Sequence, residues 1–175
     1  MGLAFIVLVP VALVGALLAR AATKPNTFRH ERSIRIQAPP EKILPFLADF
    51  HNWSAWSPWE KKDPNLKRTF SGAPSGPGAV YGWTGNGQVG TGEMEIEEAT
   101  ADRVKVKLHF IKPFEANSTA EFTLQPSGGE TNVVWAMYGD NRFMFKVMGT
   151  LMNMDKAILK DFDAGLASLK AAAEG

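Results

Sequence analysis

The side chains able to do chemistry in this chain are carboxylates, hydroxyls and a few histidines. Its 175 residues contain no cysteine and three histidines, which excludes thiol nucleophiles, disulfides and cysteine-ligated metal centres and leaves little for a histidine-based metal site. We therefore expect neither a metal nor a cofactor. The carboxylate that stands out is Asp155, because it falls near the middle of the apolar face of a predicted C-terminal helix.

Asp155 has two interpretations, and the sequence does not choose between them. In the first, a carboxylate held in apolar surroundings acts as an acid or base, or contacts a ligand, with Tyr81 as its proton partner. In the second, a basic residue of a facing strand, such as Arg32, neutralises it as an ion pair in the core. The pattern aims no second carboxylate or histidine at the same point, and acid–base catalysis needs its groups within hydrogen-bond reach of one substrate.

Aromatic and methionine side chains point to a second kind of chemistry, the binding of a hydrophobic guest. The chain has five tryptophans and seven methionines, and flat or flexible apolar side chains suit a pocket for such a guest. Plain core packing is the competing interpretation for each aromatic taken alone. The residues that we expect to line the pocket are Trp56, Trp59, Tyr81, Trp83, Met94, Phe122, Trp135, Met148, Met152 and Asp155. The first two tryptophans and Trp83 are placed at its mouth, because they adjoin segments rich in proline and glycine.

A long C-terminal helix must position the carboxylate and the methionines. Residues 142–173 follow a helical pattern, with an interruption expected at Gly149. At about 100° per residue, apolar side chains cover about half of its circumference, so this helix must be buried against a concave surface. These side chains are Val147, Met148, Leu151, Met152, Met154, Ile158, Leu159, Phe162 and Leu169.

The concave surface is expected to be a sheet. Residues 28–37 alternate with period two, Pro40 opens a short helix, and residues 65–138 predict a run of strands. Asn86-Gly87 favours a tight type I′ turn between strands at residues 80–84 and 89–97. The same segment spells G-x-G-x-x-G at residues 85–90, but a strand follows instead of a helix, so no dinucleotide is expected there.

Charge excludes nucleic acid as a partner. Lysine and arginine number 19 and aspartate and glutamate 18, for a formal charge of +1, which gives no general attraction for phosphates. The basic residues at positions 103, 105 and 107 share one strand face, and glutamates at 93, 95 and 97 share one face of the strand before it. Pairs such as Glu95 with Lys105 should neutralise this outer face.

The first 22 residues have a different character. Residues 3–19 contain no charged or strongly polar side chain, which is close to the length of ~20 apolar residues that crosses a bilayer as a helix. We therefore expect residues 1–22 to be a transmembrane anchor, residues 23–27 a linker and residues 28–175 one folded domain. Basic residues follow the apolar run, which favours a cytoplasmic domain, with a periplasmic one as the alternative. A cleaved signal peptide is a competing interpretation, although basic residues before the apolar run are missing.

Five sequence blocks together resemble a known family. They are Glu31-Arg-Ser-Ile-Arg-Ile-Gln-Ala-Pro-Pro, Trp53-Ser-Ala-Trp56-Ser-Pro-Trp59, Gly82-Trp83-Thr-Gly-Asn, Val89-Gly-Thr-Gly-Glu-Met and Asn153-Met-Asp155-Lys. In this order they are similar to the bacterial polyketide cyclase/dehydratase-like proteins of the SRPBCC, or START-like helix-grip, superfamily, over residues 28–172. The resemblance implies an α+β helix-grip fold, in which a curved antiparallel sheet of about six to seven strands wraps around a long C-terminal helix. It also implies an apolar cavity between sheet and helix.

Three functions are open on this basis, since superfamily members use the cavity differently. The leading expectation is a membrane-tethered binding protein for a hydrophobic small molecule or lipid. The second is an enzyme of the cyclase or dehydratase type, with Asp155 as acid or base and Tyr81 as its proton partner. The third is an interaction domain without catalysis, whose core is filled by its own side chains. The sequence names neither the ligand nor the oligomeric state.

Overall fold

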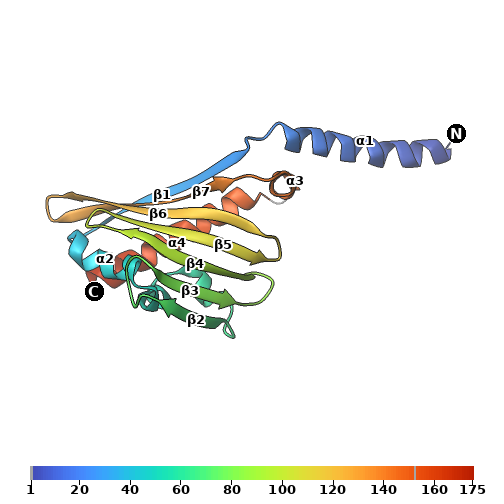
Figure 1. The fold of residues 1–175 in the computed structure, drawn as a ribbon. Coiled ribbons are helices and arrows are strands. Elements are labelled where there is room, and N and C mark those ends of the chain that lie inside the picture. Colours follow the sequence, from blue (N-terminus) through green and yellow to red (C-terminus); the bar gives the residue numbers. More distant parts are fainter. Residues whose placement is uncertain (1, 152) are drawn as a thin grey trace.

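A computed structural model describes residues 2–151 and 153–175, and Figure 1 shows one sheet with helices at its side and ends. The elements are α1 (Gly2–Ala22), β1 (Thr27–Ile36), α2 (Pro40–Ala48), the short 3-10 helices η1 (Phe50–Ala55) and η2 (Pro58–Lys61), β2 (Lys67–Gly72), β3 (Ala79–Thr84), β4 (Thr91–Ala99), β5 (Arg103–Lys112), β6 (Ala116–Ser127), β7 (Glu130–Asp140), α3 (Phe143–Leu151) and α4 (Met154–Glu174).

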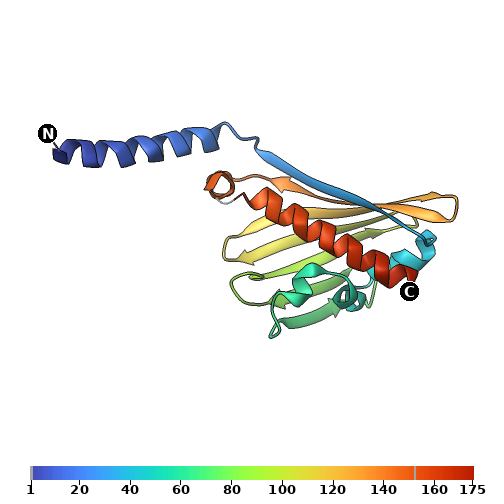
Figure 2. The same cartoon turned by 180° about the vertical axis from the view of Figure 1, so that it is seen from behind.

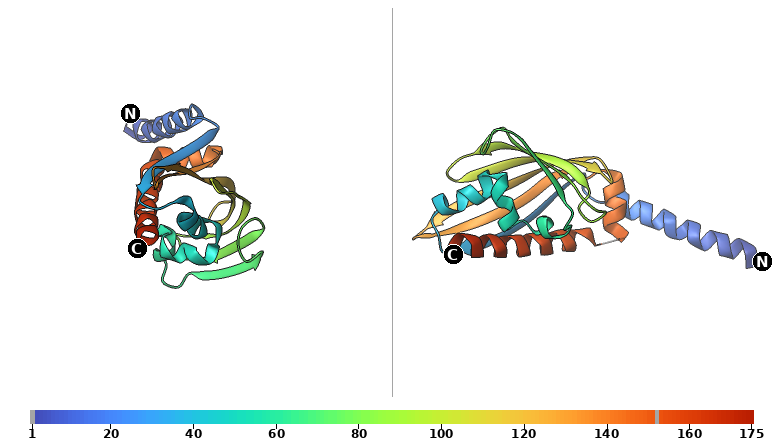
Figure 3. Two further views of the ribbon diagram at one scale, coloured as in Figure 1. Left: turned by 90° about the vertical axis from the view of Figure 1, so that its left-hand side faces the viewer. Right: turned by 90° about the horizontal axis from the view of Figure 1, so that it is seen from below.

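One antiparallel sheet of seven strands forms the body of the protein. Its order is β1-β7-β6-β5-β4-β3-β2, so strands β2 to β7 follow one another and β1 pairs with the last strand. α4 runs along the concave side of the sheet, with α2 and the 3-10 helices beside it (Figures 2 and 3). The sheet and the C-terminal helix of the predicted α+β helix-grip fold are therefore confirmed.

Alternating burial decides which face of each strand meets α4. In β5, Val104 and Val106 are fully buried between basic residues that reach solvent. Period-two patterning of this kind buries one face of a sheet and exposes the other. α2 begins with Pro40 in its first turn and contains Pro45, which keeps the helix short because proline lacks a backbone donor.

The β3–β4 hairpin forms, but without the predicted two-residue turn. The last pair of the β3–β4 ladder is Thr84 with Thr91, so the six residues 85–90 connect the strands. Asn86 is drawn toward a neighbouring loop, because its backbone N–H donates to Asp63 Oδ2 at 2.6 Å and its side-chain amide donates to the Lys62 carbonyl at 3.3 Å. Gly90 takes a positive φ of 70° instead, a conformation that glycine adopts at no steric cost.

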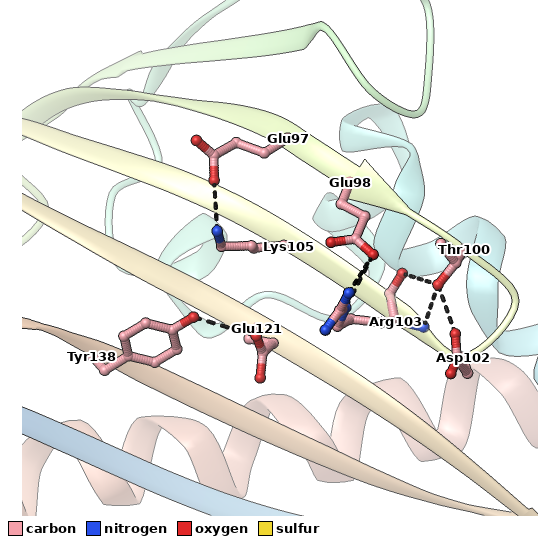
Figure 4. A network of polar contacts seen from close by, with 8 residues as sticks. All are labelled: Glu97, Glu98, Thr100, Asp102, Arg103, Lys105, Glu121 and Tyr138. Atoms are coloured by element: carbon pink, nitrogen blue, oxygen red, sulfur yellow. Dashed lines mark hydrogen bonds and ion pairs between the residues drawn. The ribbon is translucent and has the colours of Figure 1, made fainter.

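The charge pairing between β4 and β5 differs from the predicted one. Glu95 faces Lys107 instead of Lys105. Lys105 forms an ion pair with Glu97 at 3.2 Å (Figure 4). A β-bulge between Ile96 and Glu98 moves the partners nearer the turn by one further position, so the outer face is neutralised by pairs other than the predicted ones.

The C-terminal helical pattern is divided into two helices. α3 turns across one end of the sheet, while α4 continues along its concave side (Figures 1 and 3). Gly149, the predicted interruption, lies inside α3, and the break follows Leu151. Phe162 and Leu169 of the predicted apolar stripe are fully buried, whereas Leu151 is 65% exposed. The stripe is thus covered by the sheet only in its second half.

The expected transmembrane anchor is wrong. Crossing a bilayer takes about 20 consecutive apolar residues in one helix, and within residues 2–151 and 153–175 no helix is long and apolar enough to do so. α1 extends from the sheet and touches α3 (Figure 1). The predicted localisation, a single-span membrane protein with its domain in the cytoplasm or periplasm, is wrong for the same reason.

Candidate ligand-binding site

Aromatic rings fill the space between the sheet and α4. Trp135 of β7 stacks on Phe162 of α4, with ring centroids 4.0 Å apart and planes within 4°, and it also stacks on Phe122 of β6 at 5.2 Å. Trp56 and Trp59 lie edge-on to Trp135 at 5.4 and 5.7 Å. We call these five residues the aromatic cluster. Trp135 is 2% exposed, so the cluster is part of the interior.

Strand, helix and loop each contribute to the aromatic cluster. Phe122 and Trp135 are direct neighbours in the β6–β7 ladder, on the face that the strand alternation turns toward α4. Gly165 lets α4 approach, since a Cβ there would lie 2.9 Å from the Trp135 ring. Trp56 follows η1 and is fixed by its indole N–H, which donates to the Phe46 carbonyl at 2.8 Å.

The indole N–H of Trp135 has no acceptor in the described part of the chain. The other buried tryptophans donate theirs, as Trp53 does to the Leu47 carbonyl at 3.2 Å and Trp83 to the Val89 carbonyl at 3.2 Å. A buried donor without an acceptor costs about 1–3 kcal/mol, and most buried polar groups are satisfied. The aromatic cluster therefore contains one buried N–H donor without an acceptor among the described residues.

A buried carboxylate lies beside the aromatic cluster, next to Trp59. The side chain of Glu60 is 7% exposed and accepts hydrogen bonds from the Tyr81 hydroxyl at 2.5 Å and from Arg68 Nε at 2.6 Å. Burial, together with the hydrogen bond to Glu60, raises the pKa of Tyr81 well above its usual range. Tyr81 is therefore a neutral hydrogen-bond donor, and Tyr81 and Arg68 together satisfy the buried carboxylate of Glu60.

Asp155 and Tyr81 lie near opposite edges of the sheet. Asp155 occupies the first turn of α4, its side chain is 67% exposed, and Oδ1 is 3.6 Å from Nε2 of His30 on β1. Tyr81 is on β3, near the opposite edge. Arg32, the predicted partner, pairs with Asp163 at 3.1 Å instead. The helix break explains the difference from the expected apolar setting, because it makes Asp155 part of a helix end.

The other predicted pocket residues lie on the inner face or in α3. Trp83 and Met94 are each 8% exposed, on β3 and β4, and Trp83 is edge-on to Phe110 at 5.8 Å. Met148 is half-buried in α3, and Met152 lies outside the described residues. The predicted aromatic residues thus either join the aromatic cluster or continue the inner face toward β2, and Trp56 and Trp83 are buried there instead of lying at the mouth of a pocket.

Apolar side chains also gather where α3 crosses the end of the sheet. Phe145 of α3 packs edge-on to Phe114 of the β5–β6 turn, with centroids 6.3 Å apart. We call α3, this turn and the adjoining end of β5 the α3 end. Five of its large apolar side chains are between 44% and 65% exposed, and exposed apolar patches mark interaction surfaces. They are Ile111, Phe114, Phe143, Met144 and Leu151.

Two hollows lie on the outer face of the sheet. One, of about 530 Å³, lies over β1, β6 and β7, with Arg35 and Glu130 in its lining. The other, of about 300 Å³, lies over β3, β4 and β5, with Glu93 and Lys107 in its lining. Both present charged side chains, unlike the space between the sheet and α4. Within residues 2–151 and 153–175 no group of three histidine, aspartate or glutamate side chains could hold a metal ion.

Sequence reasoning missed three charged residues with buried side chains, Glu60, Asp63 and Lys146. Glu60 follows a tryptophan in η2, and its side chain is paired with the distant residues Tyr81 and Arg68. Lys146 is 6% exposed in α3 and donates to Asn26 Oδ1 at 2.6 Å. A signal for Lys146 existed, because it is the only charged residue in the otherwise apolar and small-residue sequence of α3.

Comparisons with known proteins agree with this geometry. A family model described as polyketide cyclase / dehydrase and lipid transport matches residues 27–174, which confirms the resemblance predicted from the five sequence blocks. A search of curated proteins finds no match. Among solved structures, the solution structure of the KanY protein has a TM-score of 0.63 at 16% identity, covering 86% of this chain and all (100%) of that one.

Two bacterial structures show the same likeness. Protein CV1439 from Chromobacterium violaceum has a TM-score of 0.58 at 15% identity, covering 87% of this chain and 99% of that one. The Aha1 dimer from Colwellia psychrerythraea has a TM-score of 0.58 at 16% identity, covering 84% and 96%. At such identities the similarity concerns the fold, and function must be argued from the site.

Proposed function

We propose, from the premise that the chain belongs to the polyketide cyclase, dehydrase and lipid transport family, that it binds a hydrophobic small molecule or lipid between the sheet and α4. The aromatic cluster supplies the apolar surface, since tryptophan and phenylalanine rings offer large contact areas to such a guest. Because the rings contact one another, a guest must part them to enter. The ring surfaces would then contact the guest instead of one another, and they would not be exposed to water.

The observation that carries the proposal is the unpaired indole N–H of Trp135. The rings around it offer only weak N–H···π contacts, and the residue is too buried for bulk water to serve it. A guest with a carbonyl or hydroxyl oxygen would give this N–H an acceptor and recover about 1–3 kcal/mol. The proposed guest is therefore apolar with at least one oxygen acceptor.

The α3 end is the proposed entrance. α3 is short, and its Phe145–Phe114 contact is made with a turn and not with the ladder of the sheet. Moving α3 aside would expose the end of the space between the sheet and α4 while every strand stays paired. Closure of a short segment over a bound molecule is a common way to exclude water.

The positions of the predicted catalytic pair favour binding over catalysis. Tyr81 donates to Glu60, while Asp155 is exposed beside His30. Acid–base chemistry on one substrate needs both groups within hydrogen-bond reach of it. The two side chains would therefore have to act on different molecules.

Monoolein is a suitable probe, because it combines an acyl chain with an ester carbonyl and carries no charge. Saturable quenching or a blue shift of tryptophan emission is expected when it binds the full chain. Trp135→Phe keeps a ring but removes the N–H, so it should weaken monoolein binding about tenfold, the equivalent of one neutral hydrogen bond. Trp53→Phe is the control, because the Trp53 N–H already donates to the Leu47 carbonyl, and its affinity should stay close to that of the wild type.

Two results would contradict the proposal. Absence of monoolein binding would favour the interaction domain with a filled core. Equal affinity in the wild type and in Trp135→Phe, with both folded by circular dichroism, would remove Trp135 from the site. Mass spectrometry of molecules extracted from the purified full chain would then identify the natural guest.

A further inference from the structure

A second polar site lies at the α3 end, around a buried lysine. Lys146 is 6% exposed, and its ammonium donates to Asn26 Oδ1 at 2.6 Å. An ammonium carries three donors, and a buried charge is costly unless it is paired. The ion pairs of the described residues include none for Lys146, so an uncharged amide is the partner of this buried cation.

A second lysine faces the same site from the linker between α1 and β1. Lys24 is half-buried, and its Nζ lies 3.6 Å from the position that a Cβ on Gly149 would take. Gly149 is one helical turn after Lys146, so both ammonium groups lie on the face of α3 that meets the linker. In the part of the chain that the structure describes, Lys24 also forms no ion pair. Two lysines without an ion pair in the described residues therefore face the same side of α3.

The linker that carries Lys24 and Asn26 is fixed in place by the segment before α3. Asn141 donates its backbone N–H to the Asn26 carbonyl at 2.7 Å and its side-chain amide to the Pro25 carbonyl at 3.2 Å. These bonds hold the linker against α3 at the position where Lys146 donates to Asn26. The two lysines are thus positioned by the fold, and a bound anion would neutralise both of them.

We propose that Lys24 and Lys146 bind the phosphate of a monoacyl lipid whose acyl chain enters the aromatic cluster. This inference rests on the proposed function and names its ligand class. A phosphate monoester carries a charge of about −1.5 to −2 at neutral pH, which matches the two lysines, and lysine is a common phosphate ligand. The lysine site adjoins the α3 end, where the acyl chain would enter.

Three probes separate the headgroup from the chain. Oleoyl lysophosphatidic acid has both the phosphate and the chain, monoolein has the same chain without phosphate, and glycerol 3-phosphate has the phosphate without the chain. We expect the wild-type full chain to bind lysophosphatidic acid about tenfold more tightly than monoolein, because charge-assisted hydrogen bonds are stronger than neutral ones. Glycerol 3-phosphate should compete only at far higher concentration, because it lacks apolar contact with the aromatic cluster.

Variants test the lysines directly. Lys24→Gln and Lys146→Gln should each abolish the preference for lysophosphatidic acid while leaving the affinity for monoolein unchanged. Lys160→Gln is the matched control, because it removes the same charge from an exposed position on α4 and should keep the full preference. Since replacing buried Lys146 can unfold the chain, Lys24→Gln is measured in parallel and circular dichroism is recorded for both.

The outcomes distinguish this inference from the proposed function. Equal binding of lysophosphatidic acid and monoolein by the wild type, or a preference that survives Lys24→Gln, overturns the inference and leaves the proposed function standing. Binding of neither lipid overturns the proposed function and the inference with it. Glycerol 3-phosphate that competes as well as lysophosphatidic acid overturns the lipid assignment and identifies a soluble phosphate ester as the ligand.

Discussion

At the scale of single residues, the buried carboxylate of Glu60 depends on two donors. Tyr81→Phe removes one of them, the hydroxyl 2.5 Å from Glu60, and should lower the free energy of unfolding by about 1–3 kcal/mol, because a buried charged acceptor loses a hydrogen bond. Tyr138→Phe is the matched control, since Tyr138 is only half-buried and its hydroxyl lies at the longer distance of 3.3 Å from Glu121. Its cost in urea unfolding should be smaller.

Tyr81 and Tyr138 are the two tyrosines of the chain, so the same substitution compares the loss of one hydroxyl at two positions. If Tyr81→Phe were no more destabilising than Tyr138→Phe, the Tyr81–Glu60 bond would contribute nothing to stability. Arg68 would then be sufficient to hold the Glu60 carboxylate.

His30 makes stability depend on pH in a defined direction. Burial lowers the pKa of His30 below its usual value, and nearby Asp155 opposes the effect. The folded state therefore favours neutral His30, and this contribution is present above the unfolded pKa of about 6.5 and lost as pH falls through the lower folded pKa. The free energy of unfolding should fall between about pH 7.5 and about pH 5, and His30→Phe should reduce that fall.

A control and an opposite result define this test. His109→Gln replaces a histidine on the outer face of β5, close to Glu93 and Glu115, and should leave the His30-dependent loss in place. If His30→Phe instead increased the loss of stability on acidification, Asp155 would dominate over burial. His30 would then be favoured in its charged form.

Single residues were predictable where composition signalled them and not where contacts across the sequence did. The tryptophan and methionine content predicted a lining for a hydrophobic guest, which stays a prediction, whereas Trp56, expected at the mouth of the pocket, lies in the interior. The prediction that Asp155 lies on an apolar helix face failed, because it assumed one continuous helix, whereas α3 ends at Leu151 and a new helix begins at Met154. Glu60 could not be found in advance, since its burial depends on two partners from other elements.

At the scale of elements, the contact between α4 and the sheet depends on a glycine. A Cβ at Gly165 would lie 2.9 Å from Trp135 Cζ3 and 3.0 Å from Pro58 Cδ, both rigid neighbours. Gly165→Ala should therefore push α4 from the sheet and lower the free energy of unfolding by about 1–3 kcal/mol through overpacking. This outweighs the gain of about 1 kcal/mol that alanine brings to a helix interior.

Gly149→Ala is the natural control for Gly165→Ala. Its Cβ would meet only Lys24 Nζ at an ordinary distance of 3.6 Å, so the helix-propensity gain should remain and stability should stay equal or rise. Both variants are compared by urea unfolding. A stabilised Gly165→Ala would show that the ring of Trp135 can move aside at little cost.

Strand positions were predictable from alternation, whereas turns and registers were not. The period-two pattern predicted the strand that begins the sheet, and β1 spans Thr27–Ile36. The tight turn at Asn86 failed because Asp63, from another loop, accepts from its backbone N–H. The predicted pairing of Glu95 failed because the register of β4 and β5 is centred further along the chain than the charge pattern indicates, and the bulge between Ile96 and Glu98 was not predictable from either strand alone. These features follow from contacts that a single segment does not encode.

At the scale of the whole molecule, the architecture places its weakly held part at one end. The ladder is continuous from β1 to β2, and α4 is fixed to it through Phe162 and Trp135. α3 is joined to the rest by Phe145–Phe114 and by the linker bonds of Asn26. Element order and the five sequence blocks were sufficient to predict this layered fold, but the role of the N-terminal helix was predicted wrongly from its apolar residues alone.

Hydrogen–deuterium exchange can locate the guest within this architecture. Amides of β6 and β7 should exchange most slowly, because they lie in the middle of the ladder, and those of α3 faster, because local opening needs few contacts to break. Monoolein should slow exchange in α3 and in the β5–β6 turn, since a guest between the sheet and α4 would hold the proposed entrance closed. Protection confined to residues 125–132 would instead place monoolein in the larger hollow on the outer face, which Gln125 and Asn132 line, and would move the site to the other side of the sheet.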